Sequence, residues 1–126
     1  MATETTITDT DRWLFTVEEF QKMGEAGIFH PEARVELING EIRKMSPMGH
    51  PHAFIITQLS QLIFERVGRQ RAVIAQIPVV FADHSLPAPD IGVLLHSVDE
   101  YRTRLPQSDD AILLIEVSDT TLRYDL

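Results

Sequence analysis

Apolar residues recur at helical spacing in two segments of the chain, about residues 17–26 and 51–68. Thr16 precedes the first segment and Glu19 follows three residues later, which is the capping-box pattern that begins many helices. A glycine follows each segment, at Gly27 and at position 68, where a helix is expected to end. These patterns predict a short N-terminal helix and a longer central one.

Shorter apolar runs predict five strands. Residues 34–38 and 41–45 flank Asn39-Gly40, the strongest short-range signal for a β-hairpin. Three further strands are expected at residues 72–81, 91–95 and 111–117. The last of these, AILLIEV, is almost uninterrupted in its apolar residues, which is typical of a central strand buried on both faces. Residues 96–110 are polar and predict a loop that carries a helical turn.

The order of these elements predicts an α/β fold, a mixed β-sheet flanked by helices, with an N-terminal helix and a β-hairpin in front. A length of 126 residues suits one domain, expected over residues 13–126 after a flexible segment at 1–12. Hydrophobic residues make up 44% of the chain and charged residues 24%, the profile of a soluble globular protein with a real core.

Cysteine is absent, which excludes disulfides and thiolate metal sites, so any metal must be held by oxygen or histidine ligands. The N-terminal residues lack the charged and apolar regions of a secretory signal. No apolar run approaches the roughly 20 residues needed to cross a bilayer. We therefore expect a cytoplasmic protein without a membrane partner.

The net charge of −8 argues against broad electrostatic binding to nucleic acid. A carboxylate site is nevertheless compatible with a phosphate substrate, because a bound cation reverses the local potential. Local clusters of arginine also occur in this acidic chain and could contact nucleic acid. The alternative interpretation is that these arginines are ordinary solvated surface residues. They comprise Arg66, Arg69 and Arg71, and Arg102 with Arg104.

Two carboxylates are the main candidates for chemistry. Glu116 lies in the most apolar strand, where an ionised side chain is costly without a cation or several donors. Asp90 follows a proline at the start of another apolar strand. Carboxylates on neighbouring strands can converge on a hard cation such as Mg²⁺, which binds one or two of them together with water and phosphate oxygens.

Each of these residues also has a plainer interpretation. Glu116 could pair with an arginine at a strand end or reach solvent, and Asp90 could be a turn or capping residue. A different metal site, for zinc, would use His50 and His52 with Asp83 or His84. A helix that begins near residue 51 turns the two rings of the H-x-H pair about 200° apart, which weakens that alternative.

The pair of carboxylates and its surroundings resemble the PD-(D/E)xK nucleases, and within them the Uma family of bacterial endonucleases. The resemblance covers nearly the whole chain after the N-terminus and is most specific in its last segment. It is carried by FTVEEF, RVELINGEI, KMSPMGHPHAFI, APDIGVLL and LLIEVSDTTLRYDL.

The resemblance implies a restriction-endonuclease-like fold and a nuclease that uses Mg²⁺ or Mn²⁺ on nucleic acid. It implies that Asp90 and Glu116 are metal ligands, with the carbonyl of Val117 as a further one. It adds Glu36 on the approach to the site and His52 at the head of the long helix. The plainer interpretations are an exposed hairpin carboxylate for Glu36 and a local hydrogen bond for His52.

The sequence departs from the pattern at Ser118, where such sites carry a lysine two residues after the glutamate. The resemblance implies a lysine on a helix beyond Asp125, whereas the chain stops at Leu126, so we expect a C-terminally truncated domain. Arg123 is a weak substitute, since it is a poor proton acceptor. Loss of that helix would expose one face of the last strand, which predicts a homodimer or aggregation-prone behaviour. A catalytically silent binding or dimerisation module is the alternative function.

Overall fold

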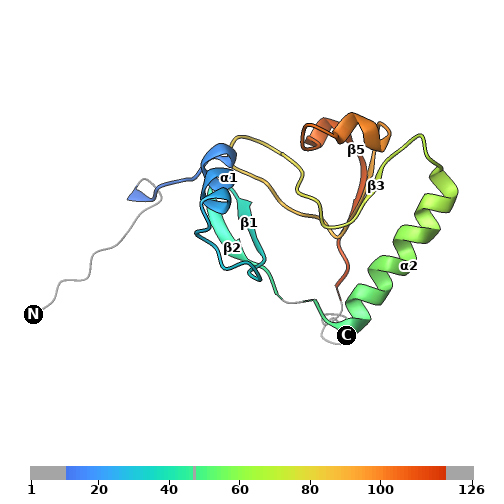
Figure 1. Ribbon diagram of the computed structural model, residues 1–126, viewed down its shortest axis with the longest axis horizontal. Helices are drawn as coiled ribbons and strands as arrows, with labels where there is room; N and C mark the ends of the chain where they lie inside the picture. Colours follow the sequence, from blue (N-terminus) through green and yellow to red (C-terminus); the bar gives the residue numbers. More distant parts are fainter. Residues whose placement is uncertain (1–10, 47, 119–126) are drawn as a thin grey trace, which may run out of the picture.

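The computed structural model describes residues 11–46 and 48–118 of the chain (Figure 1). Within these residues two α-helices, two short 3₁₀ helices and five strands follow one another along the chain. The order is α1 (Val17–Glu25), β1 (Val35–Ile38), β2 (Glu41–Lys44), α2 (His50–Val67), β3 (Val73–Ile74), β4 (Ile91–Leu94), η2 (Val98–Tyr101), η3 (Ser108–Asp110) and β5 (Ala111–Ile115).

The two predicted helices are confirmed to within about one residue at each end. The hydroxyl of Thr16 accepts from the N–H of Glu19, and the Glu19 carboxylate accepts from the N–H of Thr16, so the capping box is formed. Gly27 follows α1 and Gly68 follows α2, with φ of 77° and 74°. This left-handed region is nearly closed to side chains with a Cβ, which explains why glycine follows each helix.

The predicted hairpin is also confirmed. Asn39 and Gly40 both have positive φ, 50° and 83°, as a two-residue turn between antiparallel strands requires. A Cβ at Gly40 would lie 2.6 Å from the Cβ of Leu14, so the chain also packs too closely there for any other residue.

The α/β fold class is confirmed, and the described strands form two small antiparallel sheets rather than a single mixed one. One sheet is the β1–β2 hairpin and the other has the order β3–β4–β5. The expectation that residues 111–117 are the buried central strand is wrong, because β4 holds the centre and β5 the edge. Ile112 and Leu113 of β5 are 51% and 48% exposed, whereas β4 is buried throughout.

The predicted strand at residues 72–81 is reduced to two residues, Val73–Ile74. Gln76 has a left-handed backbone, with φ of 58°, and Pro78 lacks the N–H that a sheet ladder needs. Residues 75–90 instead run out to the hairpin and return, the yellow and gold segment of Figure 1. There the N–H of Leu86 donates to the carbonyl of Leu37 at 2.7 Å, which ties the two sheets together.

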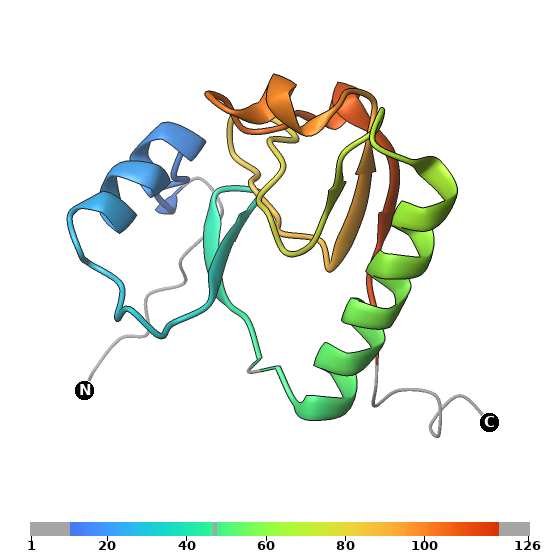
Figure 2. The ribbon, with the colours of Figure 1, turned by 45° about the vertical axis from the view of Figure 1, so that its right-hand side comes forward.

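Helix α2 runs along the three-stranded sheet and contacts β3 (Figure 2). The core lies between the sheet, this helix and the hairpin, and it comprises Leu37, Ile56, Ala72, Val79, Leu86, Ile91, Val93 and Leu94. The predicted polar loop at residues 96–110 contains the two 3₁₀ helices. None of the helices in the described ranges is both long enough and apolar enough to cross a membrane.

Candidate active site

The pairing of β4 with β5 brings the two predicted carboxylates together. Ile91 lies opposite Ile115 in this antiparallel pair. One further step in the same register places Asp90 opposite Glu116, and opposite residues in such a pair project from the same face. Two apolar strands therefore carry one carboxylate each to the same end of the sheet.

Asp90 is 5% exposed and is held by donors on both carboxylate oxygens. The backbone N–H of Val117 donates to Oδ2 at 2.7 Å, and the amide of Gln76 donates to Oδ1 at 3.5 Å. These donors fix the orientation of the carboxylate and lower the cost of its burial. The recorded contact of Val117 is thus through its N–H, and the ligand role predicted for its carbonyl stays a prediction.

His52 approaches the same carboxylate from the first turn of α2. Its Nε2 lies 3.4 Å from Oδ2 of Asp90, and its side chain is largely buried. Pro51 precedes it in the first turn, where a missing N–H costs no helical hydrogen bond. The start of α2 therefore sets the imidazole against the end of the β4–β5 pair.

Glu116 lies directly after β5, on the exposed side of the sheet edge, and not in a buried strand as its apolar neighbours predicted. Partial desolvation raises the pKa of its carboxyl, and the nearby charges of Asp90 and Glu36 raise it further. Glu116 forms no ion pair with a lysine or arginine among the described residues. The end of the sheet is therefore short of positive charge.

Glu36 faces this region from β1. Its Oε2 accepts from the N–H of Ala88 at 3.3 Å, just before the Pro89–Asp90 step. It does not line the cavity described below, but it is near enough to affect the pKa of Glu116. The role expected for Glu36 on the approach to the site stays a prediction.

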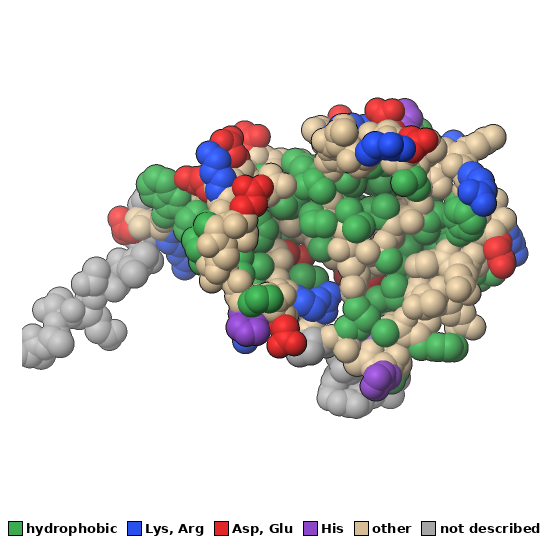
Figure 3. Space-filling view, in the orientation of Figure 1, with side chains coloured by type: hydrophobic (Ala, Val, Ile, Leu, Met, Phe, Trp, Pro, Cys, Tyr) green, Lys and Arg blue, Asp and Glu red, His purple; other side chains and the backbone are tan. Residues whose placement is uncertain are grey.

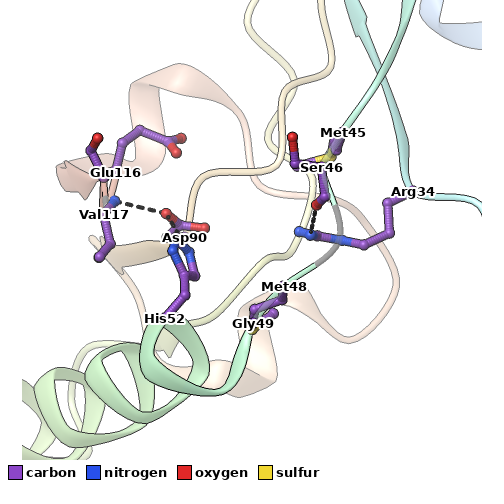
Figure 4. Close-up of a pocket in the computed structure, with 10 residues that line it drawn as sticks. Arg34, Met45, Ser46, Met48, Gly49, His52, Asp90, Glu116 and Val117 are labelled. Carbon is purple, nitrogen blue, oxygen red and sulfur yellow. Dashed lines mark hydrogen bonds and ion pairs between the residues drawn. The ribbon is translucent and has the colours of Figure 1, made fainter. Parts of the chain in front are cut away.

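A cavity of about 360 Å³ opens between the hairpin and the start of α2. Figure 3 shows it as a hollow with acidic side chains in its depth and a basic side chain at its rim. In Figure 4, Asp90, His52 and Glu116 line one side and Arg34 reaches in from the other. The lining residues are Arg34, Met45, Ser46, Met48, Gly49, His52, Asp90, Glu116, Val117 and Ser118.

The donor set fits a small hard cation that keeps several waters. Within residues 11–46 and 48–118, no three Asp, Glu, His or Cys side chains converge as a complete metal-holding group. Asp90 and Glu116 supply two carboxylates without a basic ion-pair partner apart from His52. Mg²⁺ and Mn²⁺ accept such a set, because water and substrate oxygens complete their coordination.

The zinc alternative does not fit the structure. His52 lines the cavity of Asp90, whereas Asp83 and His84 line a different cavity beside α1. The Nδ1 atom of His84 lies 2.9 Å from the carbonyl of Phe15, and His50 is exposed. These side chains do not meet at one point.

The arginines of the second predicted basic cluster form ion pairs with acidic side chains. Arg102 pairs with Asp99, and Arg104 pairs with Asp110 and Glu100. Neither arginine lines the cavity of Asp90. The expectations for Arg123 and for a lysine beyond Asp125 lie outside the described residues, as does most of the predicted flexible segment 1–12.

The sequence reasoning missed two residues near the carboxylates. Arg34 precedes β1 and gave no signal beyond its charge, and Gln76 was assigned to a regular strand. Arg34 and Gln76 lie near the two carboxylates only because the hairpin and the irregular segment 75–90 fold back onto the end of the sheet.

The described helices and strands form an α/β fold of the restriction-endonuclease type. The chain belongs to the Uma2 family, described as "Putative restriction endonuclease", whose model matches residues 17–126. Among curated proteins, no sequence matches this chain.

A solved structure confirms the fold. It is the crystal structure of a putative nuclease belonging to DUF820 from Anabaena variabilis ATCC 29413, with a TM-score of 0.54 and 21% sequence identity. The match covers 82% of this chain and 52% of the other, so this chain spans about half the length of that protein.

Proposed function

We propose that this chain is a divalent-metal-dependent endonuclease that hydrolyses phosphodiester bonds of nucleic acid, with Mg²⁺ or Mn²⁺ held by Asp90 and Glu116. The observation that carries the proposal is the β4–β5 register, which brings these two carboxylates together at a cavity. The printed descriptions of the Uma2 family and of the similar Anabaena protein agree with this activity.

The residues of the chain have distinct parts in this proposal. Asp90 is the fixed ligand, because Val117, Gln76 and His52 hold its carboxylate in one orientation. Glu116 is the more exposed ligand, and a bound cation would favour the charged form of its carboxyl, whose pKa is raised by partial desolvation and by Asp90 and Glu36. Glu36 adds negative charge beside Glu116 and so favours a cation. A bound divalent ion would supply positive charge against phosphate oxygens and acidify water.

The first experiment is calorimetric titration of Mn²⁺ and Mg²⁺ into the full chain. We expect saturable binding, and at least a 100-fold loss of affinity in Asp90→Asn and in Glu116→Gln because each loses a charged ligand. Asp99→Asn is the matched control, since Asp99 is a well-exposed acidic residue far from the cavity. Absence of binding by a folded wild-type chain would overturn the proposal.

A module that binds without cleaving is a second candidate, and Ser118 favours it. Ser118 lines the cavity at the position where a lysine is expected in this class. Incubation of supercoiled plasmid DNA with the Mn²⁺-loaded chain separates the two candidates. Nicking that Asp90→Asn removes supports the endonuclease, whereas metal binding without any nicking supports the silent module.

We also propose that the chain forms a homodimer through the exposed edge of β5. Ile112 and Leu113 are about half exposed on this strand, and β5 pairs only with β4 among the described residues. An apolar edge strand is a template for a second copy. Sedimentation should give a dimer that Leu113→Lys dissociates, with Val98→Lys as the matched exposed control. A wild-type monomer at high concentration would contradict this.

A further inference from the structure

Arg34 is the only arginine or lysine that lines the cavity of Asp90 in the described part of the chain. Its backbone is fixed, because the carbonyl of Arg34 accepts from the N–H of Met45 at 2.7 Å, which extends the hairpin pairing. The side chain points toward the carboxylate side of the cavity, and its guanidinium meets the carbonyl of Ser46 (Figure 4).

The guanidinium is held at one nitrogen and open at the others. Nη1 donates to the carbonyl of Ser46 at 2.7 Å. Among the described residues Ser46 is its one acceptor, and no carboxylate forms an ion pair with it. An arginine carries five N–H donors in a rigid fork, so several of them remain available on the cavity side.

The charges around the cavity indicate what the remaining N–H donors of Arg34 would bind. A divalent cation held by Asp90 and Glu116 would offset their two negative charges, and the negative charge of an entering phosphodiester would then lack compensation. Of the residues that the structure describes, Arg34 is the one lysine or arginine on the wall of the cavity, and it can provide that compensation. Guanidinium groups bind phosphate oxygens through two parallel hydrogen bonds, which fixes orientation as well as charge.

We propose that Arg34 is the phosphate-binding residue of this site, donating hydrogen bonds to a non-bridging oxygen of a nucleic-acid backbone opposite Asp90 and Glu116. This inference rests on the proposed endonuclease function and adds the residue that holds its substrate. Ser46 keeps the side chain in place through its carbonyl, which lowers the entropy lost when phosphate binds.

The test measures binding of short fluorescein-labelled single-stranded and double-stranded DNA by anisotropy, at several salt concentrations and with saturating Mg²⁺. We expect Arg34→Ala and Arg34→Gln to weaken binding about 10-fold and to reduce the salt slope by about one, as loss of a phosphate contact does. Arg34→Lys keeps the charge and should keep the slope. Calorimetric Mn²⁺ affinity should stay within about 2-fold in all three, because Arg34 is not a ligand.

Two further variants make the outcome decisive. Arg66→Ala removes the same charge from an exposed position at the far end of α2 and should bind DNA like the wild type. Arg34→Gln retains an N–H donor for the carbonyl of Ser46. If this variant bound DNA like the wild type, Arg34 would act by positioning the loop at Ser46, and the inference would be overturned. Unchanged DNA binding in Arg34→Ala would overturn the inference about Arg34 but not the proposed function. Failure of the wild type to bind metal or DNA would overturn both.

Discussion

Strands β4 and β5 are nearly equal in apolar character but differ in their surroundings. The IGVL of β4 is buried at every position, between β3 on one side and β5 on the other. The AILLI of β5 has one neighbour among the described strands, and its central side chains are about half exposed. The carboxylates next to these strands differ in the same way, since Asp90, just before β4, is buried and Glu116, just after β5, is exposed.

The difference teaches that the proposed cation site would combine a rigid carboxylate with an adaptable one. Asp90 enters the buried strand and is oriented by fixed donors on both oxygens. Glu116 follows the edge strand, lines the cavity from an exposed position and has a raised pKa. A cation site built in this way needs little reorganisation at one ligand and accepts it at the other.

The largest expected effect is a difference in the free energy of unfolding between a variant in β4 and a variant in β5. Leu94→Ala in β4 should lower the free energy of unfolding by about 3 kcal/mol, because its fully buried side chain leaves a cavity. Leu113→Ala in β5 should cost less than about 1 kcal/mol, because its side chain already contacts water. Urea denaturation of both variants measures the difference.

The same pair of variants tests whether β5 is covered in solution. Equal losses for Leu94→Ala and Leu113→Ala would mean that something buries the edge strand, and a dependence of the Leu113→Ala loss on protein concentration would identify a second copy. Equal losses without that dependence would contradict both the comparison and the homodimer.

The next effect concerns how the start of β5 is anchored. Asp110 accepts from the guanidinium of Arg104 at 2.8 Å and from the N–H of Gln107 at 3.0 Å, and these donors lower its pKa to about 2. Asp110→Asn should therefore lower the free energy of unfolding by about 1–2 kcal/mol at neutral pH.

The pH dependence of the Asp110 contribution has a definite sign. A depressed folded-state pKa stabilises the fold above the ordinary value of 3.8 and loses that contribution as pH falls toward about 2. The gap between wild type and Asp110→Asn should thus close below pH 3.8 in urea titrations. Asp109→Asn, at an exposed neighbouring position, should show no gap at any pH, and a constant gap for Asp110→Asn would refute the ionic anchor.

A smaller effect is expected at the contact that orients Asp90. His52→Gln should weaken Mn²⁺ binding about 10-fold, since residues that orient a ligand typically contribute a factor of 10–100. His50→Gln changes an exposed histidine two residues earlier and should leave the affinity unchanged. Calorimetry that finds the two variants alike would remove His52 from the site.

The fold was predictable wherever local signals agree with the final packing. The capping box at Thr16, the Asn39–Gly40 turn and the glycines after both helices each act through their immediate neighbours, so the sequence predicts them directly. The order of β3, β4 and β5 depends on long-range pairing. An apolar run in the sequence does not indicate whether its strand pairs with one neighbouring strand or with two. For that reason β5 was mistaken for the central strand.

The site was predictable in its residue types but not in its surroundings. Asp90 and Glu116 stand out because carboxylates beside apolar strands need an explanation. Arg34 and Gln76 lie far from them in sequence and meet them only through the irregular segment 75–90 and the hairpin. The spacing of apolar residues along the sequence cannot predict such a contact, because the contact depends on how segment 75–90 folds back.

The smallest expected effect is at Glu116, where stability and binding should change in opposite directions. A carboxyl whose folded-state pKa is raised contributes stability that is present below its ordinary value of 4.5 and lost as pH rises through the raised value. At neutral pH without metal, Glu116→Gln should therefore stabilise the chain, by less than about 1 kcal/mol because solvent screens this exposed group. The gain should vanish below pH 4.5, where the wild-type carboxyl is protonated as well. Thermal melts of both proteins across this pH range, with Glu65→Gln as an exposed control, measure it. A loss of stability in metal-free Glu116→Gln would mean that the carboxylate is satisfied by the protein alone, and the charge deficit argued for the site would not exist.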